Sequence, residues 1–424
     1  MTEEYQARTG RPTPTTAAIF ALAWPLAVNA ILLHGIVIID AFLVSLLGEE
    51  ALAAMGLAVA IAGLLLGALA ALSHATQILV AQAQGADDAI ALKSAFWCGL
   101  IISAVATGFG LTLIWTVGGD IVRHFAHTPD IAEDALAYLH IFAIVIICET
   151  GSQAISCHFN GTGRTWLPFC SHLAQMPVNI GLSILLIFGL YGFPELGLSG
   201  AAIGSAVAAF VRLLFLVTCL RRFDGAVMGA PGWAEATFLR SIKRHVIFAL
   251  PVAATFFGQA TCNAVCSLLY ARMSINEFAA MTLILPWVQV AGMIMISWAQ
   301  ATGIFIGQLL GGQASNESLD EFLARAWRVA LSLAALVSAL YLAASLSFRW
   351  IYDDLQPETL DALWSFVSAL LLLTFPKSSN AICGSTLRAG GDTVRVMNIH
   401  LISQWAYRVP LTALLVLYLE WSVT

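Results

Sequence analysis

Long apolar runs recur along the whole chain, and they constrain its fold more than any other feature. A bilayer-spanning helix needs about 20 consecutive apolar residues, and runs of that length alternate here with short connections rich in Gly, Asp and Glu. About eleven spans are expected, at roughly 17–47, 51–83, 93–118, 132–159, 166–190, 197–220, 241–271, 277–309, 322–346, 358–386 and 394–419. The pattern predicts an all-α polytopic membrane protein, because a spanning helix satisfies its own backbone hydrogen bonds. A transmembrane barrel would show short alternating segments instead.

Composition excludes several classes of function. Hydrophobic residues make up 59% of the 424 residues and charged residues only 10%, and the net charge of −6 argues against a nucleic-acid partner. The chain contains no Gly-x4-Gly-Lys-Ser/Thr phosphate loop, so we expect no use of ATP. It also lacks a Ser-His-Asp or zinc-hydrolase pattern, so we expect no enzyme activity, cofactor or metal site. The eight cysteines are interpreted as small apolar filler.

The Lys and Arg residues predict the orientation in the membrane. With a cytoplasmic N-terminus, most of them fall on cytoplasmic connections: Lys93, Arg164, Arg221, Arg222, Arg240, Lys243, Arg244, Arg325, Arg328, Arg388 and Arg395. The opposite side then has Arg123, Arg272 and Arg349. We therefore expect a multi-pass protein of the cell (inner) membrane, with residues 1–16 as a cytoplasmic tail and 221–240 as a cytoplasmic link.

The two halves of the chain repeat, with 17–220 forming one helical lobe and 241–424 the other. Pro25 and Pro251 open the halves, and Ala53-Ala54-Met55 recurs as Ala279-Ala280-Met281 at the same offset of about 226 residues. Gln82 and Gln308, and Gly85 and Gly311, keep that register. If each half has six spans, both begin on the same side, so we expect two pseudo-symmetric lobes about an axis along the membrane normal. The substrate site is then expected between them.

Asp40 is the single ionisable acid in the first apolar run, Trp24–Gly48. A carboxylate deep in a spanning helix costs about 2.5–3.5 kcal/mol on insertion scales, so it indicates a functional site facing protein or water. Asn29 and Ile36 share its helix face, which gives it no charged partner on its own helix. We interpret Asp40 as the binding site of the coupling ion in a secondary transporter.

Other spans carry polar residues at helical spacing, which must meet protein or water rather than lipid. We predict a substrate cavity lined by Asn29, Glu149, Gln153, Gln259, Asn263, Trp287, Lys377 and Asn380. Helix–helix hydrogen bonding explains the uncharged members equally well, and ordinary packing is an alternative for Trp287. Glu149 and Lys377 occupy equivalent places in the two halves, so an ion pair between them is a further hypothesis.

An ordered set of short motifs resembles the multidrug and toxic compound extrusion (MATE) family over nearly the whole chain. Asp40, the Ala-Leu-Ala-Ala-Met run of 51–55 and Gln82-Ala83-Gln84-Gly85-Ala86 match that family's first two spans. Asn160-Gly161-Thr162-Gly163-Arg164-Thr165, Gly197-Leu198-Ser199-Gly200-Ala201-Ala202 and Leu387-Arg388-Ala389-Gly390-Gly391-Asp392-Thr393 match the end of its fourth span, the start of its sixth and the end of its tenth.

The resemblance implies two six-helix lobes that export organic compounds against proton or sodium entry. It implies that Asp40 is the ion site and that Asn179, Asn160 and Ser205 lie near its polar neighbours. Ser183 stands where some members carry a second acid, and Gln259 and Lys377 stand where another branch carries acids. Members usually have twelve spans, so either the last helix is absent here or the sequence is incomplete at that end.

With one acid in the first lobe, we expect coupling to a proton rather than to sodium, which prefers several oxygen ligands. The expected partners are a small organic substrate and the lipid bilayer, with the protein as a monomer. Lys377 in the cavity leaves anionic or zwitterionic substrates open beside organic cations. The alternatives are a flippase for a lipid-linked or amphipathic precursor, which would use Lys377, Arg388 and Arg408, and an intramembrane enzyme or receptor.

Overall fold

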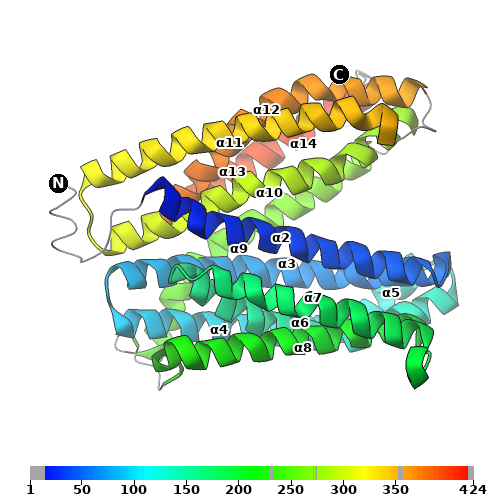
Figure 1. Cartoon of the computed structure of the whole chain (residues 1–424), viewed down its shortest axis with the longest axis horizontal. Coiled ribbons are helices and arrows are strands. Elements are labelled where there is room, and N and C mark those ends of the chain that lie inside the picture. Colours follow the sequence, from blue (N-terminus) through cyan, green and yellow to red (C-terminus); the bar gives the residue numbers. More distant parts are fainter. Residues whose placement is uncertain are drawn as a thin grey trace. The chain divides into compact units, whose positions relative to one another are not determined.

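The computed structural model describes residues 15–229, 233–235, 237–270, 272, 275–351 and 357–418, and nearly all of them are helical (Figure 1). The side chains of 275–287, 344, 347–351, 357–362 and 418 lie outside that description. The first half contains α2 (Thr16–Ser45), α3 (Glu49–Gly85), α4 (Ala89–Leu113), η1 (Ile114–Gly118), α5 (Gly119–Phe125), α6 (Pro129–Gly161), α7 (Trp166–Phe188), η2 (Leu190–Gly192), α8 (Gly197–Asp224) and η3 (Gly225–Met228). The second half contains α9 (Phe238–Tyr270), α10 (Ile275–Gly311), α11 (Asn316–Ile351), α12 (Pro357–Ala389), α13 (Thr393–Ile402), η4 (Ser403–Arg408), α14 (Val409–Ala413) and η5 (Leu414–Tyr418).

The helices have the length and hydropathy that a bilayer requires. Among the described residues, ten helical segments are long and apolar enough to cross a membrane. The predicted eleventh span is helical as well, but the π-helical stretches η4 and η5 interrupt its α-helical geometry. The structure confirms the predicted all-α polytopic fold.

The short connections end and restart the helices through local hydrogen bonds. The carboxylate of Asp88 accepts from the backbone N–H groups of Ile90 and Ala91, both at 2.9 Å, which caps the N-terminus of α4. Thr128 caps α6 in the same way, and Pro129 follows at its first position. These polar turns return the chain into the apolar layer after a few residues.

The chain divides into two compact units, each described here by itself. The N-terminal unit is Val28–Ala253, and the C-terminal unit is Ala254–Thr424 together with Met1–Ala27. Each division falls two residues after a proline inside a helix, Pro25 in α2 and Pro251 in α9. A proline removes one backbone hydrogen bond and weakens the helix locally. The lobe and link boundaries expected from the sequence stay a prediction.

Within the N-terminal unit, α7 and α8 approach closely because α8 presents glycines to its neighbour. A Cβ atom at Gly200 would lie 2.6 Å from the Leu186 carbonyl oxygen, and one at Gly204 would lie 2.6 Å from the Ser183 hydroxyl. Small residues of this kind allow helix backbones to pack tightly in membranes. The close contact brings polar side chains of α7 and α8 together below the surface.

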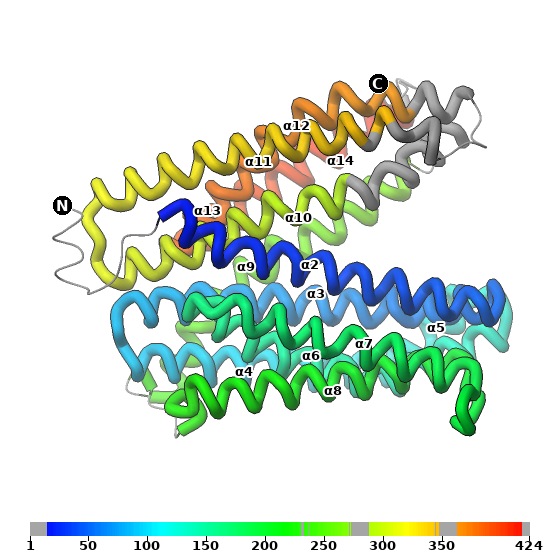
Figure 2. The backbone as a smooth tube through the Cα atoms, viewed as in Figure 1, coloured from blue at the N-terminus to red at the C-terminus, as the bar shows by residue number. Residues whose placement is uncertain are grey.

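Within the C-terminal unit, α12 packs against both α10 and α11, and α11 and α12 run side by side (Figure 2). Met295, Ala334, Val337 and Tyr341 form a buried apolar cluster in this layer. Trp298 is also buried, and its indole N–H donates to the Ala326 carbonyl at 3.1 Å. Trp298 therefore packs α10 against α11.

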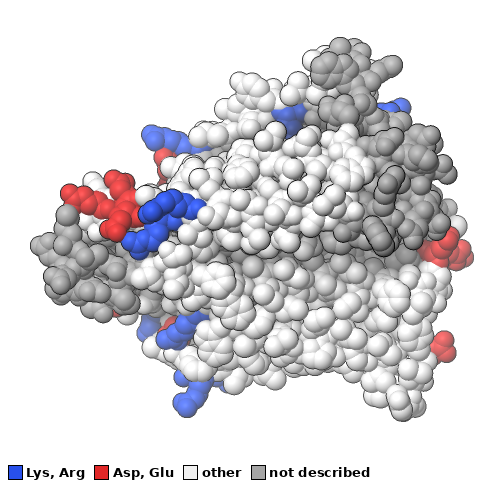
Figure 3. Space-filling model, turned by 45° about the horizontal axis from the view of Figure 1, so that its top comes forward, with Lys and Arg blue, Asp and Glu red and all other residues white. Residues whose placement is uncertain are grey.

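Charged side chains avoid most of the molecular surface in view. Figure 3 shows few Lys, Arg, Asp and Glu side chains among the described residues of the face in view. Many large apolar side chains, such as Phe42, Phe109 and Leu372, are exposed. An apolar surface of this extent requires a lipid environment.

Candidate functional site

Asp40 meets two of its expected neighbours inside the N-terminal unit. The Ser205 hydroxyl, on α8, donates to Oδ2 of Asp40 at 3.2 Å. The side-chain amide of Asn179, on α7, donates to the Ser205 hydroxyl oxygen at 2.9 Å. The sequence resemblance placed these residues near one another, and the glycine-lined contact of α7 with α8 makes the arrangement possible.

Three oxygen atoms in this cluster have no hydrogen-bond partner among the described residues. They are Oδ1 of Asp40, Oδ1 of Asn179 and the Ser183 hydroxyl oxygen, all buried at the atomic level. Ser183 lies one helical turn after Asn179 on α7 and against Gly204 of α8. A buried acceptor without a partner costs about 1–3 kcal/mol. The cluster can therefore receive a proton, a cation or a water molecule.

Tyr138 is a member of this region that the sequence analysis missed. It is buried on α6, its ring stacks on Phe142 with centroids 5.5 Å apart, and the charge of Asp40 acts on its hydroxyl group. The sequence analysis did not single it out, because it belongs to none of the polar stripes considered there. The only signal for Tyr138 would have been the residue type itself, because a buried tyrosine hydroxyl usually has a polar partner, such as a carboxylate.

Asn160 is not beside Asp40, which corrects the expectation from the resemblance. Its amide donates to the side-chain oxygen of Gln77, on α3, at 3.4 Å. Asn160 lies 22 residues beyond Tyr138 on the same α6 helix, a separation of roughly 33 Å. Asn160 therefore belongs to the opposite end of the unit from the acid.

Glu149 has its charged partner within the N-terminal unit, and that partner is Arg212. The Arg212 guanidinium on α8 donates to Oε2 of Glu149 on α6, and Gln175 donates to Oε1 at 3.1 Å. Arg212 also reaches the hydroxyl groups of Ser171 and Ser156, each at 3.4 Å. Glu149 thus has a charged partner within its own unit, and the hypothesis of an ion pair with Lys377, which belongs to the other unit, stays a prediction.

The sequence contained a signal for Arg212 that was not used. Arg212 is the single Lys or Arg in the apolar run 197–220, and an intramembrane charge needs a partner. Gln153, predicted with Glu149, lies one turn further along α6 and donates weakly to the Cys157 sulfur at 3.7 Å. Asn29 on α2 is partly buried, and its Oδ1 has no partner among the described residues.

In the C-terminal unit, two predicted cavity residues are brought together. Gln259 donates to Oδ1 of Asn263 at 3.0 Å along α9. Arg408, on η4, donates to the same oxygen at 2.8 Å and to Oε1 of Gln404 at 2.9 Å. The amide oxygens of Asn263 and Gln404 thus accept hydrogen bonds from the Arg408 guanidinium group.

Lys377 and Asn380 lie exposed on α12 of this unit, one turn apart. A Cβ atom at Gly292 of α10 would lie 3.1 Å from the Lys377 ammonium nitrogen, so the ammonium group lies against α10. Lys377 has no ion pair with any described residue. The side chain of Trp287 lies outside the described residues, so its role stays a prediction.

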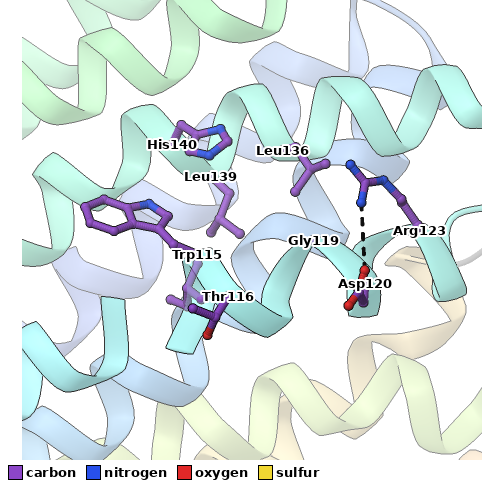
Figure 4. A pocket seen from close by; sticks show the side chains of 9 residues that line it. Trp115, Thr116, Gly119, Asp120, Arg123, Leu136, Leu139 and His140 are labelled. Atoms are coloured by element: carbon purple, nitrogen blue, oxygen red, sulfur yellow. Dashed lines mark ion pairs between the residues drawn. The ribbon is translucent and has the colours of Figure 1, made fainter. Parts of the chain in front are cut away.

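A surface pocket of about 260 Å³ lies elsewhere in the N-terminal unit, between α6 and the segment formed by η1 and α5 (Figure 4). Trp115, Thr116, Asp120, Arg123 and His140 line it, and Arg123 and Asp120 form an ion pair at 3.8 Å. None of the ion-coupling or substrate-cavity residues predicted from the sequence lines this pocket. Among the described residues, no group of three His, Cys, Asp or Glu side chains could hold a metal ion.

These features define a class of protein. The molecule is a polytopic helical membrane protein that carries a partly paired acid in its first span and a buried ion pair in its fourth and sixth. The MatE family model matches residues 25–185 and 251–414, two segments that begin at Pro25 and Pro251. The chain belongs to the MATE family of multidrug efflux transporters.

Proteins with similar sequences are named as multidrug resistance proteins or as transporters. The "Probable multidrug resistance protein NorM" of Rhizobium meliloti is 24% identical, with 86% of this chain and 79% of that protein covered. The protein of the same name from Pseudomonas aeruginosa is 25% identical, with 96% and 84% covered. The "Uncharacterized transporter YisQ" of Bacillus subtilis is 21% identical, with 97% and 90% covered.

Solved structures share the fold. A crystal structure of "MATE in the bent conformation" superposes with a TM-score of 0.83 at 18% identity, covering 99% of this chain and 91% of the other. The eukaryotic MATE transporter AtDTX14 gives a TM-score of 0.81 at 18% identity, with 96% and 89% covered.

Proposed function

We propose that this chain is a secondary active antiporter that exports small organic compounds in exchange for protons. Membership of the MATE family supports the export of small organic compounds. The distribution of Lys and Arg supports a cell (inner) membrane location with a cytoplasmic N-terminus. The protein works as a monomer, without ATP and without a bound cofactor.

The observation that carries the coupling is the half-satisfied carboxylate of Asp40. One of its oxygens accepts from Ser205, and the other is buried without a partner among the described residues. A proton needs only one carboxylate oxygen. Sodium, as a hard cation, prefers several oxygen ligands with negative charge among them. Asp40 is the single acid in its cluster, and this favours the proton.

The exchange of protons for substrate follows from the change in charge of the Asp40 carboxylate. Protonation from the outer side removes the negative charge of Asp40 and changes its interaction with Ser205. Loss of the proton restores the carboxylate on the other side of the membrane. Exchange requires that proton and substrate bind the outward and inward states unequally, so that each shifts the population for the other.

Efflux from proteoliposomes tests the proposal, with a panel of fluorescent aromatic compounds and imposed gradients of proton or sodium. Asp134→Asn is the matched control, since Asp134 is an exposed acid on α6. The wild type and Asp134→Asn should drive uphill transport under a proton gradient, and Asp40→Asn should not. Uphill transport by Asp40→Asn under the same gradient would contradict the proposal. Transport driven by sodium alone at equal pH would contradict proton coupling.

A further inference from the structure

Three basic side chains of the C-terminal unit lie in sequence from the end of α12 into the helix that follows. Arg388 is in the last turn of α12, His400 lies on α13 and Arg408 ends η4. Arg388 and Arg408 both contact α9, at Phe256 and at Asn263, which lie seven residues apart on one face of that helix. Arg408 lies eight residues beyond His400, roughly 12 Å along the helix axis. We refer to Arg388, His400 and Arg408 as the basic row.

No described carboxylate pairs with the basic row. Arg408 donates only to the neutral amide oxygens of Asn263 and Gln404. Nε of Arg388 and Nε2 of His400 are buried and have no hydrogen-bond partner among the described residues. Buried polar atoms without partners are rare in folded proteins and require an explanation.

Other arginines of this chain show the usual arrangement. Arg325 pairs with Glu321 at 2.8 Å, Arg395 pairs with Asp392 at 3.1 Å, and Arg212 pairs with Glu149. Arg408 lies inside the last apolar run and yet has no acid partner among the described residues, so its counter-charge has to come from elsewhere.

Aromatic side chains accompany the basic row. The Arg388 guanidinium lies over the Phe256 ring, 5.8 Å from its centroid. A Cβ atom at Gly258, two residues along α9, would lie 3.9 Å from the indole nitrogen of Trp405, so Trp405 approaches α9 beside Phe256. Both rings are partly exposed. Aromatic faces next to guanidinium groups bind flat rings that carry a negative group.

We propose that the basic row binds the anionic group of the exported compound, and that the substrates are flat aromatic carboxylates, sulfonates or phosphates. The inference rests on the proposed export function and names its substrate class. Arg388 and Arg408 each present a planar fork of N–H donors, which matches the two or three oxygens of such a group. Phe256 and Trp405 contact the ring, and the neutral amides of Asn263 and Gln404 hold Arg408 without neutralising it.

Binding is tested first, because it does not depend on transport. The probes are naphthalene-2-sulfonate and naphthalen-2-yl-trimethylammonium, which share a ring and differ in the sign of charge. The purified full chain in detergent should bind the sulfonate and show a raised melting temperature. Arg388→Gln and Arg408→Gln should each weaken its binding by about tenfold or more, the effect of losing one charge-assisted hydrogen-bond pair.

Control variants separate binding from folding. Arg395→Gln removes a guanidinium from α13 that is exposed and already paired with Asp392, so sulfonate binding should stay as in the wild type. Arg408→Lys keeps the charge and should retain part of the affinity. Melting temperatures without ligand identify any variant that has lost its fold. Equal binding of the sulfonate by the wild type and by folded Arg388→Gln and Arg408→Gln would overturn the proposal.

Transport in proteoliposomes separates this inference from the proposed function. Uphill export of the ammonium compound under a proton gradient, with neither binding nor export of the sulfonate, would overturn the anion site and leave the antiporter standing. Binding of the sulfonate without transport of any compound would overturn the antiporter and leave the anion site standing. Export of the sulfonate that depends on Arg388 and Arg408 would support both.

A lipid headgroup carries the same chemistry as a soluble phosphate, so the vesicles include a third probe. A fluorescent isoprenyl phosphate in the inner leaflet reports transbilayer movement through its quenching by external dithionite. Movement that depends on Arg408, without export of soluble sulfonate, would assign the basic row to a lipid-borne phosphate. If the protein neither binds nor exports the sulfonate and does not move the isoprenyl phosphate across the bilayer, the inference is wrong.

Discussion

The guanidinium group of Arg212 on α8 is hydrogen-bonded to the carboxylate of Glu149 on α6; Arg212 is buried, Glu149 is largely buried, and hydroxyl and amide groups contact both. An intramembrane ion pair is costly to form, but removing one partner is costlier, because it leaves an uncompensated charge. Substitution of Glu149 or Arg212 alone is therefore expected to destabilise the protein, because the remaining charge loses its partner.

We predict that Arg212→Gln and Glu149→Gln each lower the free energy of unfolding by about 3–5 kcal/mol, the cost of breaking a buried ion pair. The double variant should recover much of this loss, because two neutral amides hydrogen-bond to each other without a charge. Thermal unfolding in detergent micelles measures the effect. A double variant as unstable as the sum of the two single variants would show that the groups do not act as a pair.

The hydrogen-bond chain from Asn179 through Ser205 to Asp40 leads to a second prediction. Ser205→Ala removes a bond to a charged group, worth about 1.5–3 kcal/mol, and should slow proton-driven efflux by at least tenfold. Asn179→Ala acts through the same hydroxyl, so the double variant should be little slower than Ser205→Ala alone. The measurement is the initial rate of efflux at one fixed proton gradient for the wild type, the two single variants and the double variant, which together form a double-mutant cycle. Losses that multiply would mean that Asn179 and Ser205 act separately.

Tyr138 allows a test of a second hydroxyl group in the region of Asp40. Tyr138→Phe keeps the ring and its stacking on Phe142, so the melting temperature should stay close to that of the wild type. The phenol dipole next to the carboxylate is lost, and proton-driven efflux should fall several-fold. Tyr341→Phe in the other unit removes a hydroxyl that bonds the Val288 carbonyl, and it serves as the control for efflux. Normal efflux by Tyr138→Phe would exclude the hydroxyl from the coupling.

The sequence was sufficient to predict the helices, because span length and polar turns are local properties. It also placed Asp40, Asn179 and Ser205 together, through motifs that the family shares. Partners across helices were harder to predict. Glu149 and Asn160 share one helix face by spacing, but a face extends along the axis, and the two residues are 11 positions apart. A common face therefore did not mean a common site.

The pairing of Glu149 with Arg212 depended on which faces of α6 and α8 meet, and spacing within one helix carries no such information. The same limit applies to Arg408. It belongs to η4, where the π-helical geometry shifts every following side chain relative to a regular α-helix. Its contact with Gln404, four residues earlier, agrees with helical spacing, but its contact with Asn263 on α9 could not be obtained from a period of 3.6 residues.

The closest approach of α7 and α8 gives the sharpest test of how the fold positions the site. A Cβ atom at Gly204 would lie 2.6 Å from the Ser183 hydroxyl and 2.9 Å from the Ser183 backbone nitrogen, so Gly204→Ala has to push the helices apart. We expect a loss of about 1–3 kcal/mol from overpacking and slower efflux, because Asn179 and Ser205 separate. Gly181→Ala on α7 is the matched control, since its Cβ meets no atom within 4 Å. Alanine also favours a helix over glycine by about 1 kcal/mol, so Gly181→Ala should be at least as stable as the wild type and equally active. If Gly204→Ala behaved like Gly181→Ala in both melting temperature and efflux, the glycine contact would not be what holds the Asp40 cluster together.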